Sequence, residues 1–355
     1  MNRVSNGIPG ETFTIKELEI FHHFTMVTAF TLGDQGTHQR IWQSVVPQLA
    51  FKHTFLMHGL LAISAMHMAG LRESERDSLS VIAANHQDVG LREFQSELNT
   101  FTSESCHALF AFSILVVFYI PASSGSRINE DTVSSSFLND SLLDAVIDWV
   151  RLIRGVKGIV DRGRQWLVDG PLEPLVVRDE WFQPIEPSSE NYRDEDQHLA
   201  SLEELWTGVA VHTEEEQAET QLYEDALQRL RESFARMSVA EFTIDQCPWC
   251  RPSDTPQGIT HIRRLISGFM WLLTMPHEFF KLLEQRRPVA LILLAHHSIL
   301  LSRMTGPELW WTKAAPTKTV TSVSATLPTS YYAWIEWPRQ ECLEGKRRTS
   351  RSAER

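Results

Sequence analysis

The chain has 355 residues, four of them cysteines, and a formal net charge of −12 at neutral pH. This acidic balance argues against a body that binds DNA or RNA by neutralising phosphates. So few cysteines in so long a chain exclude a disulfide scaffold and favour a reducing compartment, the nucleus or the cytoplasm. The hydrophobic content of 43%, with 11 Trp and 18 Phe, is enough for a large core.

Helical periodicity dominates the first hundred residues. We expect residues 1–15 to be a flexible leader without a secretory signal. A helix should start near Lys16, with Leu18, Phe21, Thr25 and Thr28 at helical spacing and Phe24 beside them. Pro47 should end or kink the next helix. Residues 55–71 predict a buried helix, and residues 74–98 predict an amphipathic helix on the outside of the globule. Small residues recur three or four apart in the first of these two: Gly59, Ala62, Ala65 and Ala69.

The stretch 105–122 is apolar on nearly every side, as in a buried central helix or a membrane span. Its apolar part runs over 108–120 and is interrupted only by Ser113. This part is shorter than the roughly 20 residues that a bilayer requires. We therefore predict that it is the hub of a helical core, capped by Thr102 or Ser103, and that the chain has no membrane span.

The second half predicts further helices separated by loops at about 123–139, 168–195 and 245–258. Asp140 is the expected N-cap of a helix over 141–156. The Thr- and Ser-rich segment 320–327 predicts a frayed helix, and residues 344–355 predict a basic, disordered tail. Strand alternation is absent over any convincing length. The predicted fold is all-α: one large multi-helix domain over 16–343, with buried hydrophobic helices at its centre.

Cys247 and Cys250 form the motif C-P-W-C. Such pairs occur in redox dithiols and as halves of zinc sites. The redox use requires a strand–helix setting and the zinc use requires two more ligands, so we favour structural cysteines while both roles stay open. No G-x-S-x-G, H-E-x-x-H or P-loop motif occurs. We therefore predict no catalytic residue, no metal site and no enzyme.

The surplus of aromatic residues suggests an apolar ligand pocket instead. In this hypothesis two histidines of an otherwise apolar helix supply the polar anchor, and the competing interpretation is that every candidate is ordinary core. The candidate ligand-binding residues are Phe110, Phe112, Phe118, Tyr119, Trp271, Phe279, His296 and His297.

Eight ordered segments carry a family resemblance. They are L-E-I-F-H-H-F-T (18–25), W-Q-S-V-V-P-Q-L-A (42–50), F-L-M-H-G-L-L-A-I-S-A-M-H-M-A (55–69), A-L-F-A-F-S-I-L-V-V-F-Y (108–119), W-V-R-L-I-R-G-V (149–156), R-P-V-A-L-I-L-L-A-H-H-S-I-L-L (287–301), W-W (310–311) and W-I-E-W-P (334–338). Their order across about 17–340 resembles the C-terminal regulatory domain of fungal zinc-cluster (Zn2Cys6) transcription factors of the sterol uptake control type.

The resemblance implies an all-α regulatory and activation domain, often dimeric, that controls nuclear entry and gene activation. In sterol-responsive members an apolar pocket binds ergosterol. The partners implied are therefore a sterol or other apolar molecule, and a second copy of the chain or another transcription factor. No cysteine precedes Cys106, so the family's six-cysteine cluster is absent from this sequence. We expect no zinc cofactor unless such a cluster precedes the segment, and no direct DNA binding by this chain alone. Pro316 departs from the family's regular helix near the expected pocket.

Two other interpretations remain open. The chain could be a ligand-free dimerisation scaffold, with the small-residue face of 55–69 as the subunit contact. It could also be a biosynthetic enzyme with an apolar cavity, although no acid–base or metal set supports that interpretation.

Overall fold

The computed structural model describes residues 14–33, 36–124, 135–176, 190–207, 213–238, 256–304 and 307–344. Every regular element within these ranges is a helix, so the predicted all-α class is confirmed. Cys247 and Cys250 lie outside the described residues, as do residues 1–13 of the predicted leader and residues 345–355 of the predicted tail.

The N-terminal helices form one core. Thr14 and Glu17 cap the first of them reciprocally, because the Glu17 N–H donates to Thr14 Oγ1 (3.2 Å) and the Thr14 N–H donates to Glu17 Oε2 (2.6 Å). The elements are α1 Ile15–Met26, η1 Thr28–Thr31, α2 Thr37–Arg40, η2 Ile41–Val45, α3 Val46–Ala50, α4 Thr54–Leu71, η3 Glu73–Glu75 and α5 Arg76–Asn99.

The buried face of α1 agrees with the predicted spacing only in part. Phe24 and Thr28 are buried, as is Ile20, whereas Leu18 is 57% exposed and Phe21 and Thr25 are half-buried. Because α1 packs on α4 through the side that carries Ile20 and Phe24, the stripe through Leu18 faces outward.

α4 is buried within the chain itself. Ala62 and Ala65 are 0% exposed and Ala69 is 1% exposed. Gly59 lies against the ring of Phe112, where an added Cβ would come within 2.7 Å of Cδ2. The small-residue face predicted as a subunit contact is therefore already covered by the chain's own helices, which removes the contact on which the scaffold interpretation rested.

α6 (Cys106–Ser124) is the predicted hub. It starts after Thr102, whose Oγ1 accepts a hydrogen bond from the Ser105 N–H at 3.3 Å, as the sequence predicts for an N-cap. Its side chains serve two hydrophobic cores: Phe112 belongs to the N-terminal core and Val117 to the C-terminal core. An element that is apolar all round is thereby covered on both sides.

Among the described residues, α4 and α6 are each long and apolar enough to cross a membrane, by length and composition alone. The uninterrupted apolar part of this stretch, 108–120, is short, but α6 as a whole passes the test of length and composition. Of their 18-residue apolar windows, 78% and 72% are buried inside the protein. Burial against neighbouring helices thus accounts for their apolar surface.

α7 (Ser135–Val168) is longer than the sequence predicts. It begins inside the predicted loop 123–139, places Asp140 within the helix rather than at its N-cap, and continues past 156. The predicted loop 168–195 also contains η5 (Glu173–Leu175) and the start of α8 (Glu190–Ser201). Glycines at 155, 158 and 163 lower the helix propensity of this segment, so the sequence predicts an earlier end of the helix than the structure shows.

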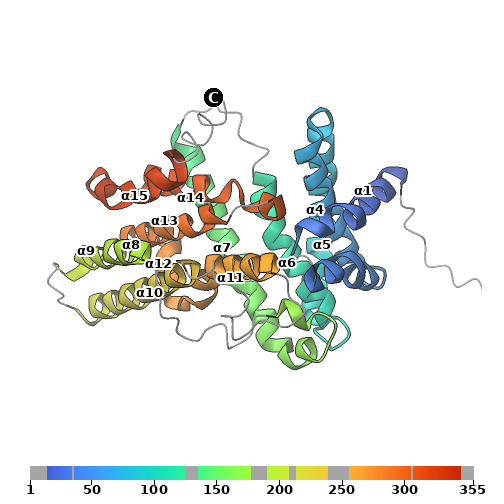
Figure 1. Ribbon diagram of the computed structural model, residues 1–355, viewed down its shortest axis with the longest axis horizontal. Coiled ribbons are helices and arrows are strands. Elements are labelled where there is room, and N and C mark those ends of the chain that lie inside the picture. The colour runs from blue at the N-terminus through green and yellow to red at the C-terminus, as the bar shows by residue number, and fades with distance from the viewer. Residues whose placement is uncertain are drawn as a thin grey trace, which may run out of the picture.

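The C-terminal helices form the second core (Figure 1). Figure 1 shows the blue N-terminal helices on one side, the yellow to red C-terminal helices on the other, and α6 and α7 between them. The remaining elements are α9 Glu204–Thr207, α10 Glu214–Ser238, α11 Pro256–Thr274, α12 His277–Glu284, α13 Pro288–Arg303, η8 Pro307–Thr312, α14 Ala315–Thr326, η9 Thr329–Ile335, α15 Glu336–Arg339 and η10 Gln340–Glu344.

Prolines mark helix starts in this fold. Pro316 lies in the first turn of α14, where its missing N–H has no intrahelical partner to lose. It therefore starts a helix rather than breaking one, and 320–326 is regular helix rather than frayed. The interruption predicted at Pro47 takes the form of the π-helical turn η2 just before it.

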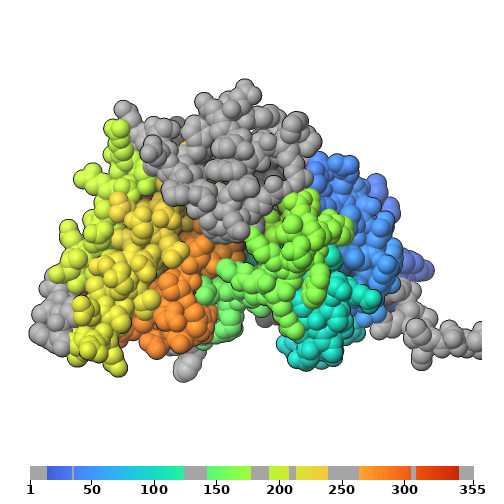
Figure 2. All heavy atoms as spheres, turned by 90° about the horizontal axis from the view of Figure 1, so that it is seen from below, coloured from blue at the N-terminus to red at the C-terminus, as the bar shows by residue number. Residues whose placement is uncertain are grey.

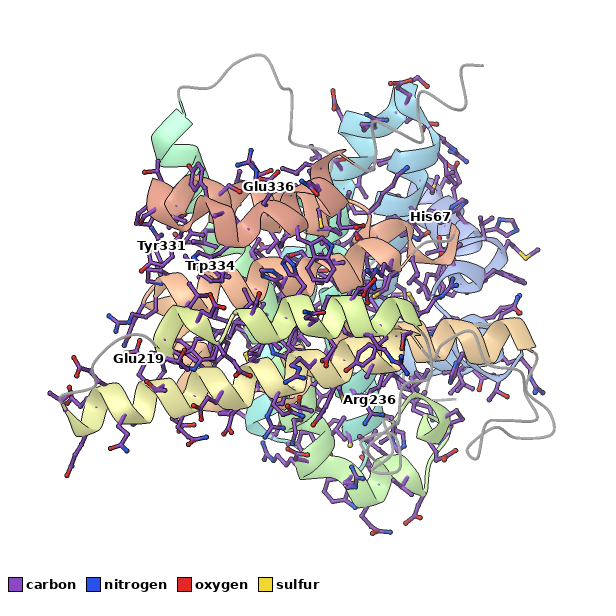
Figure 3. All side chains as sticks on the ribbon, turned by 60° about the vertical axis from the view of Figure 1, so that its left-hand side comes forward. His67, Glu219, Arg236, Tyr331, Trp334 and Glu336 are labelled. Atoms are coloured by element: carbon purple, nitrogen blue, oxygen red, sulfur yellow. The ribbon has the colours of Figure 1, made fainter. Side chains whose placement is uncertain are left out.

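Forked ion pairs join α8 to its neighbours. Arg231 of α10 contacts both oxygens of Asp196 at 2.7 and 2.8 Å. Arg303 of α13 contacts both oxygens of Glu195 at 3.1 and 2.5 Å. Such two-point pairs fix the angle between helices as well as the distance. A further carboxylate, Glu219 on α10, is labelled in Figure 3.

The close approach of α4 and α6 can be tested with a glycine pair on one helix. Gly59→Ala should lower the free energy of unfolding by roughly 1–3 kcal/mol, because the new methyl meets the fully buried Phe112 ring. Gly70→Ala is the matched control: nothing lies within 4 Å of the added Cβ, and it should stabilise by up to about 1 kcal/mol. Urea denaturation measures both, and equal effects would contradict the packing.

Candidate functional site

A cavity of about 300 Å³ lies where α6, α7 and α11 meet. Figure 2 shows the green surface of α7 and the segment after it between the orange C-terminal helices and the blue N-terminal helices. Each of the three helices contributes one face with helical spacing. The wall residues are Phe110, Ile114, Val117 and Phe118 from α6, Ile153, Val156, Lys157, Val160, Asp161 and Arg164 from α7, and Leu265, Ile266, Phe269 and Leu273 from α11.

The N-terminal core closes the fourth side of the cavity. Leu32, His38 and Trp42 line it there, together with Pro174 and Leu175 of η5. A ring N–H of His38, at Nε2, donates to the Pro174 carbonyl at 2.9 Å. This bond holds η5 against α2, so the segment after α7 folds back over the cavity.

Aromatic rings connect the cavity walls to one another. Phe118 lies 6.1 Å from Trp42 and 4.2 Å from Trp311, measured between ring centroids. Trp311 stacks on Phe269 at 6.0 Å with an interplanar angle of 17°. Two cavity-lining rings, one from α6 and one from α11, are thus bridged by a tryptophan of η8.

The neighbouring Trp310 joins η8 to the N-terminal core. Its indole stacks on His67 of α4 at 4.7 Å and 18°, and its Nε1–H donates to Thr31 Oγ1 at 3.0 Å. Figure 3 labels His67 on the blue helices, away from Trp334 and Glu336 of the C-terminal helices. The W-W pair therefore contacts both sides of the molecule.

Of the eight residues predicted to bind a ligand, Phe110 and Phe118 line the cavity. Phe112 points to the opposite side of α6, where its ring meets Phe55 at 5.6 Å and Phe94 at 4.9 Å. Tyr119 is buried in the N-terminal core and is not among the lining residues.

The other four predicted residues lie in the C-terminal core. Trp271 stacks on His297 at 5.0 Å and packs edge-on against Phe279 at 5.7 Å, so the structure brings these three together. His296 points elsewhere, toward His198 and Trp337 at 5.9 and 5.8 Å. None of the four lines the cavity, and their binding of a ligand stays a prediction.

Both histidines of α13 bond to helix carbonyls. His297 donates from Nε2 to the Gly268 carbonyl at 2.6 Å, and His296 donates from Nδ1 to the Ile292 carbonyl at 2.8 Å. Burial lowers the pKa of each imidazole to about 4, partly opposed by these carbonyls. Both rings are therefore neutral at pH 7.

The sequence did not single out most of the lining residues. Val160 and Arg164 lie beyond 156, where the sequence predicts the end of this helix, and Val156 is the last residue of the predicted helix. A signal was present, since Ile153, Val156, Val160 and Arg164 recur at helical spacing through the glycine-containing segment. Phe269 and Trp42 carried no signal beyond being aromatic.

A second cavity of about 280 Å³ lies on the other side of α7, between α5, α6 and α7. It shares Val156 with the first cavity, and Arg162 at its edge sits over the Phe101 ring at 4.4 Å. Within the described part of the chain, no group of three or more His, Cys, Asp or Glu could hold a metal ion. Burial raises the pKa of the Cys106 thiol to about 11, so it is not a reactive thiolate at neutral pH.

Comparison with known proteins finds a family match for the N-terminal part of the chain. Residues 19–169 match the model of the fungal specific transcription factor domain. The matched part of the chain, called the transcription factor domain below, is therefore similar to that family. The domain contains α6 and α7, two walls of the cavity, whereas α11 lies beyond it. The resemblance predicted from the ordered segments is confirmed.

Named relatives agree with the domain match. The chain is 25% identical to a Zn(2)-C6 fungal-type transcription factor of Gibberella zeae, over 93% of this chain and 62% of the relative. It is 27% identical to the Zn(2)-C6 fungal-type transcription factor afumD of Aspergillus fumigatus, over 80% of this chain and 66% of the relative. Sterol uptake control protein 2 of Candida albicans is 29% identical over 28% of this chain and 14% of the relative. The chain spans less than two thirds of the length of the first two.

The buried histidines predict how stability depends on pH. The pKa of His297 is about 4 in the folded protein against 6.5 unfolded, so unfolding takes up a proton between these values. The free energy of unfolding is therefore unaffected by the titration of His297 above pH 6.5. It falls as the pH drops toward 4, by up to about 3 kcal/mol. Urea unfolding of His297→Gln should show a shallower loss of stability over this window.

His22→Gln, which removes an exposed histidine of α1, is the control for that experiment. It should keep the wild-type pH dependence. If His297→Gln and wild type lose stability in parallel between pH 6.5 and 4, the neutral, buried state assigned to His297 is wrong.

Proposed function

We propose that this chain is the regulatory part of a fungal transcription regulator and that it senses a small apolar molecule in the cavity between α6, α7 and α11. The transcription factor domain and the names of the relatives support the regulatory role and a place of action in the nucleus. They also favour a regulator over an enzyme. The zinc cluster in the relatives' names is a feature of those proteins. We propose that this chain acts together with a second copy of itself or with a partner factor.

The observation that carries the proposal is the composition of the cavity walls. α6 and α7 belong to the transcription factor domain, and α11 belongs to the C-terminal helices outside it. A ligand between them buries apolar surface on both parts at once. Its binding free energy therefore favours the arrangement in which the two parts are closed on each other.

Aromatic contacts connect the cavity walls to the rest of the molecule, so a shift of the walls on ligand binding would also move other elements. Phe118 and Phe269 line the cavity and both pack on Trp311. Trp310, the next residue, is stacked on His67 of α4. Occupancy that shifts either phenylalanine would alter the contact of η8 with the N-terminal core.

The size and lining of the cavity bear on the kind of ligand. Ligand pockets hold about 300–1,000 Å³ and are mostly apolar with a few polar groups. This cavity, at about 300 Å³, is at the small end. The name of the Candida albicans relative makes a sterol one candidate, and the size favours a smaller apolar body.

A reporter assay tests the proposal. The full chain, fused to a heterologous DNA-binding domain in a fungal host, should activate a reporter above the DNA-binding domain alone. Ile114→Phe, which fills the cavity from α6, should change the output at least about fivefold at equal protein level, the size of a typical allosteric coupling.

Gly158→Leu is the matched control. It fills the second cavity, and no atom lies within 4 Å of its added Cβ, so its output should equal that of wild type. A wild-type fusion that never activates or represses the reporter would count against the regulatory role. Equal outputs from all three fusions would count against the cavity as the sensing site.

A further inference from the structure

A run of polar side chains lies inside the N-terminal core. Thr28 of η1 and Ser64 and His67 of α4 are all buried there, next to helix faces that are otherwise apolar. A buried polar group is costly unless it is hydrogen-bonded, so filling space does not explain three of them in one place. A polar network that is fully bonded holds the elements that carry it in one arrangement.

Hydrogen bonds connect these side chains in one direction. The Ser64 hydroxyl donates to the Ile20 carbonyl of α1 at 2.8 Å, so its oxygen is left to accept from the Thr28 hydroxyl at 3.5 Å. His67 Nδ1 lies 3.0 Å from Thr28 Oγ1. We assign the hydrogen to Nδ1, because His67 then donates to Thr28 and each donor of the run has an acceptor. Burial lowers the pKa of His67 to about 4, so its ring is neutral at pH 7.

Trp310 of η8 meets this run at two points. Its indole stacks on His67, and its Nε1–H donates to Thr31 Oγ1 at 3.0 Å. The Thr31 hydroxyl in turn donates to the Thr28 carbonyl at 2.8 Å. A movement of Trp310 therefore acts on Thr28 both through the ring of His67 and through the hydroxyl of Thr31.

We propose that a relay of side chains carries the occupancy of the cavity to α1. The relay consists of Trp310, Thr31, Thr28, His67 and Ser64. This inference rests on the proposed ligand-sensing cavity and names the element at which its occupancy is read out. One end of the relay is next to Trp311, which packs on the cavity wall, and the other end is the Ile20 carbonyl of α1. Figure 1 shows α1 at the outer side of the N-terminal helices, away from α11.

The longest bond of the relay makes it sensitive to small shifts. The 3.5 Å between Thr28 and Ser64 is at the limit of hydrogen-bond geometry, so further lengthening breaks this bond. A buried hydroxyl that loses its acceptor is disfavoured by an amount comparable to a typical allosteric coupling, roughly 5–150-fold. The relay is therefore either intact or broken. Coupling between distant sites requires such a two-state element.

Hydrogen–deuterium exchange of the full chain tests the relay, with dodecan-1-ol as the apolar probe. Saturation with the probe should slow exchange in α1 by at least about fivefold, because a closed cavity keeps the relay intact. Thr31→Val removes the acceptor of the Trp310 indole at nearly constant volume. In this variant the α1 response should fall below about twofold. Protection of α7 and α11 should stay as in the wild type, as should the dissociation constant of the probe, measured by isothermal titration calorimetry.

Thr25→Val is the matched control. It removes a half-buried hydroxyl from α1 itself, which bonds to the His22 carbonyl at 3.0 Å and lies outside the relay. This variant should keep the full α1 response. If Thr31→Val does not fold, Trp310→Phe takes its place, because phenylalanine keeps a ring on His67 and removes the Nε1–H donor.

The outcomes separate the relay from the proposed function. An equal α1 response in Thr31→Val and Thr25→Val, whether kept or lost, would overturn the relay and leave the sensing cavity in place. Protection of α7 and α11 without a response of α1 in the wild type would do the same. A Thr31→Val variant that no longer binds the probe would show that Thr31 acts on the cavity itself, which also contradicts the relay. If the wild type does not bind the probe, both the relay and the cavity as a ligand site are wrong, and the reporter assay decides the regulatory role alone.

Discussion

The structure depends on one constraint: α6 is apolar on every side, so every side has to be covered. A single layer of helices can cover one face of a helix, which is why α6 lies between two cores. Phe112 faces α4 and α5, where Gly59 and Gly90 make room for its ring, and Val117 faces the C-terminal helices. The cavity forms along the part of α6 where the N-terminal core and the C-terminal core meet.

This placement connects packing with the proposed regulation. The transcription factor domain contributes α6 and α7, and the helices that follow it contribute α11 and the W-W pair. Trp310 and Trp311 are adjacent in the chain, yet one contacts α4 and the other contacts the cavity wall. Any molecule that fills the cavity therefore acts on the contact surface between the two cores.

The sequence predicted the fold class, the central position of α6 and the family, because those depend on long apolar stretches and ordered segments that few structures accommodate. It misplaced elements where local propensity and tertiary packing disagree. α7 runs through three glycines because its face packs on α6 and α11, and α1 buries Ile20 rather than Leu18 because α4 lies on that side.

Of the candidate site, Phe110 and Phe118 line the cavity, whereas Trp271 and His297 pack on each other in the C-terminal core. Composition predicts that aromatic residues are buried, but it does not say which of them border an empty volume.

The central claim is that ligand in the cavity joins the two cores. Hydrogen–deuterium exchange of the full chain, with and without saturating dodecan-1-ol, measures this most directly. The account predicts slower exchange in α7, in α11 and in η8 together, because closure of the cavity stabilises all three against local opening. Protection confined to one helix, or no change in η8, would contradict it.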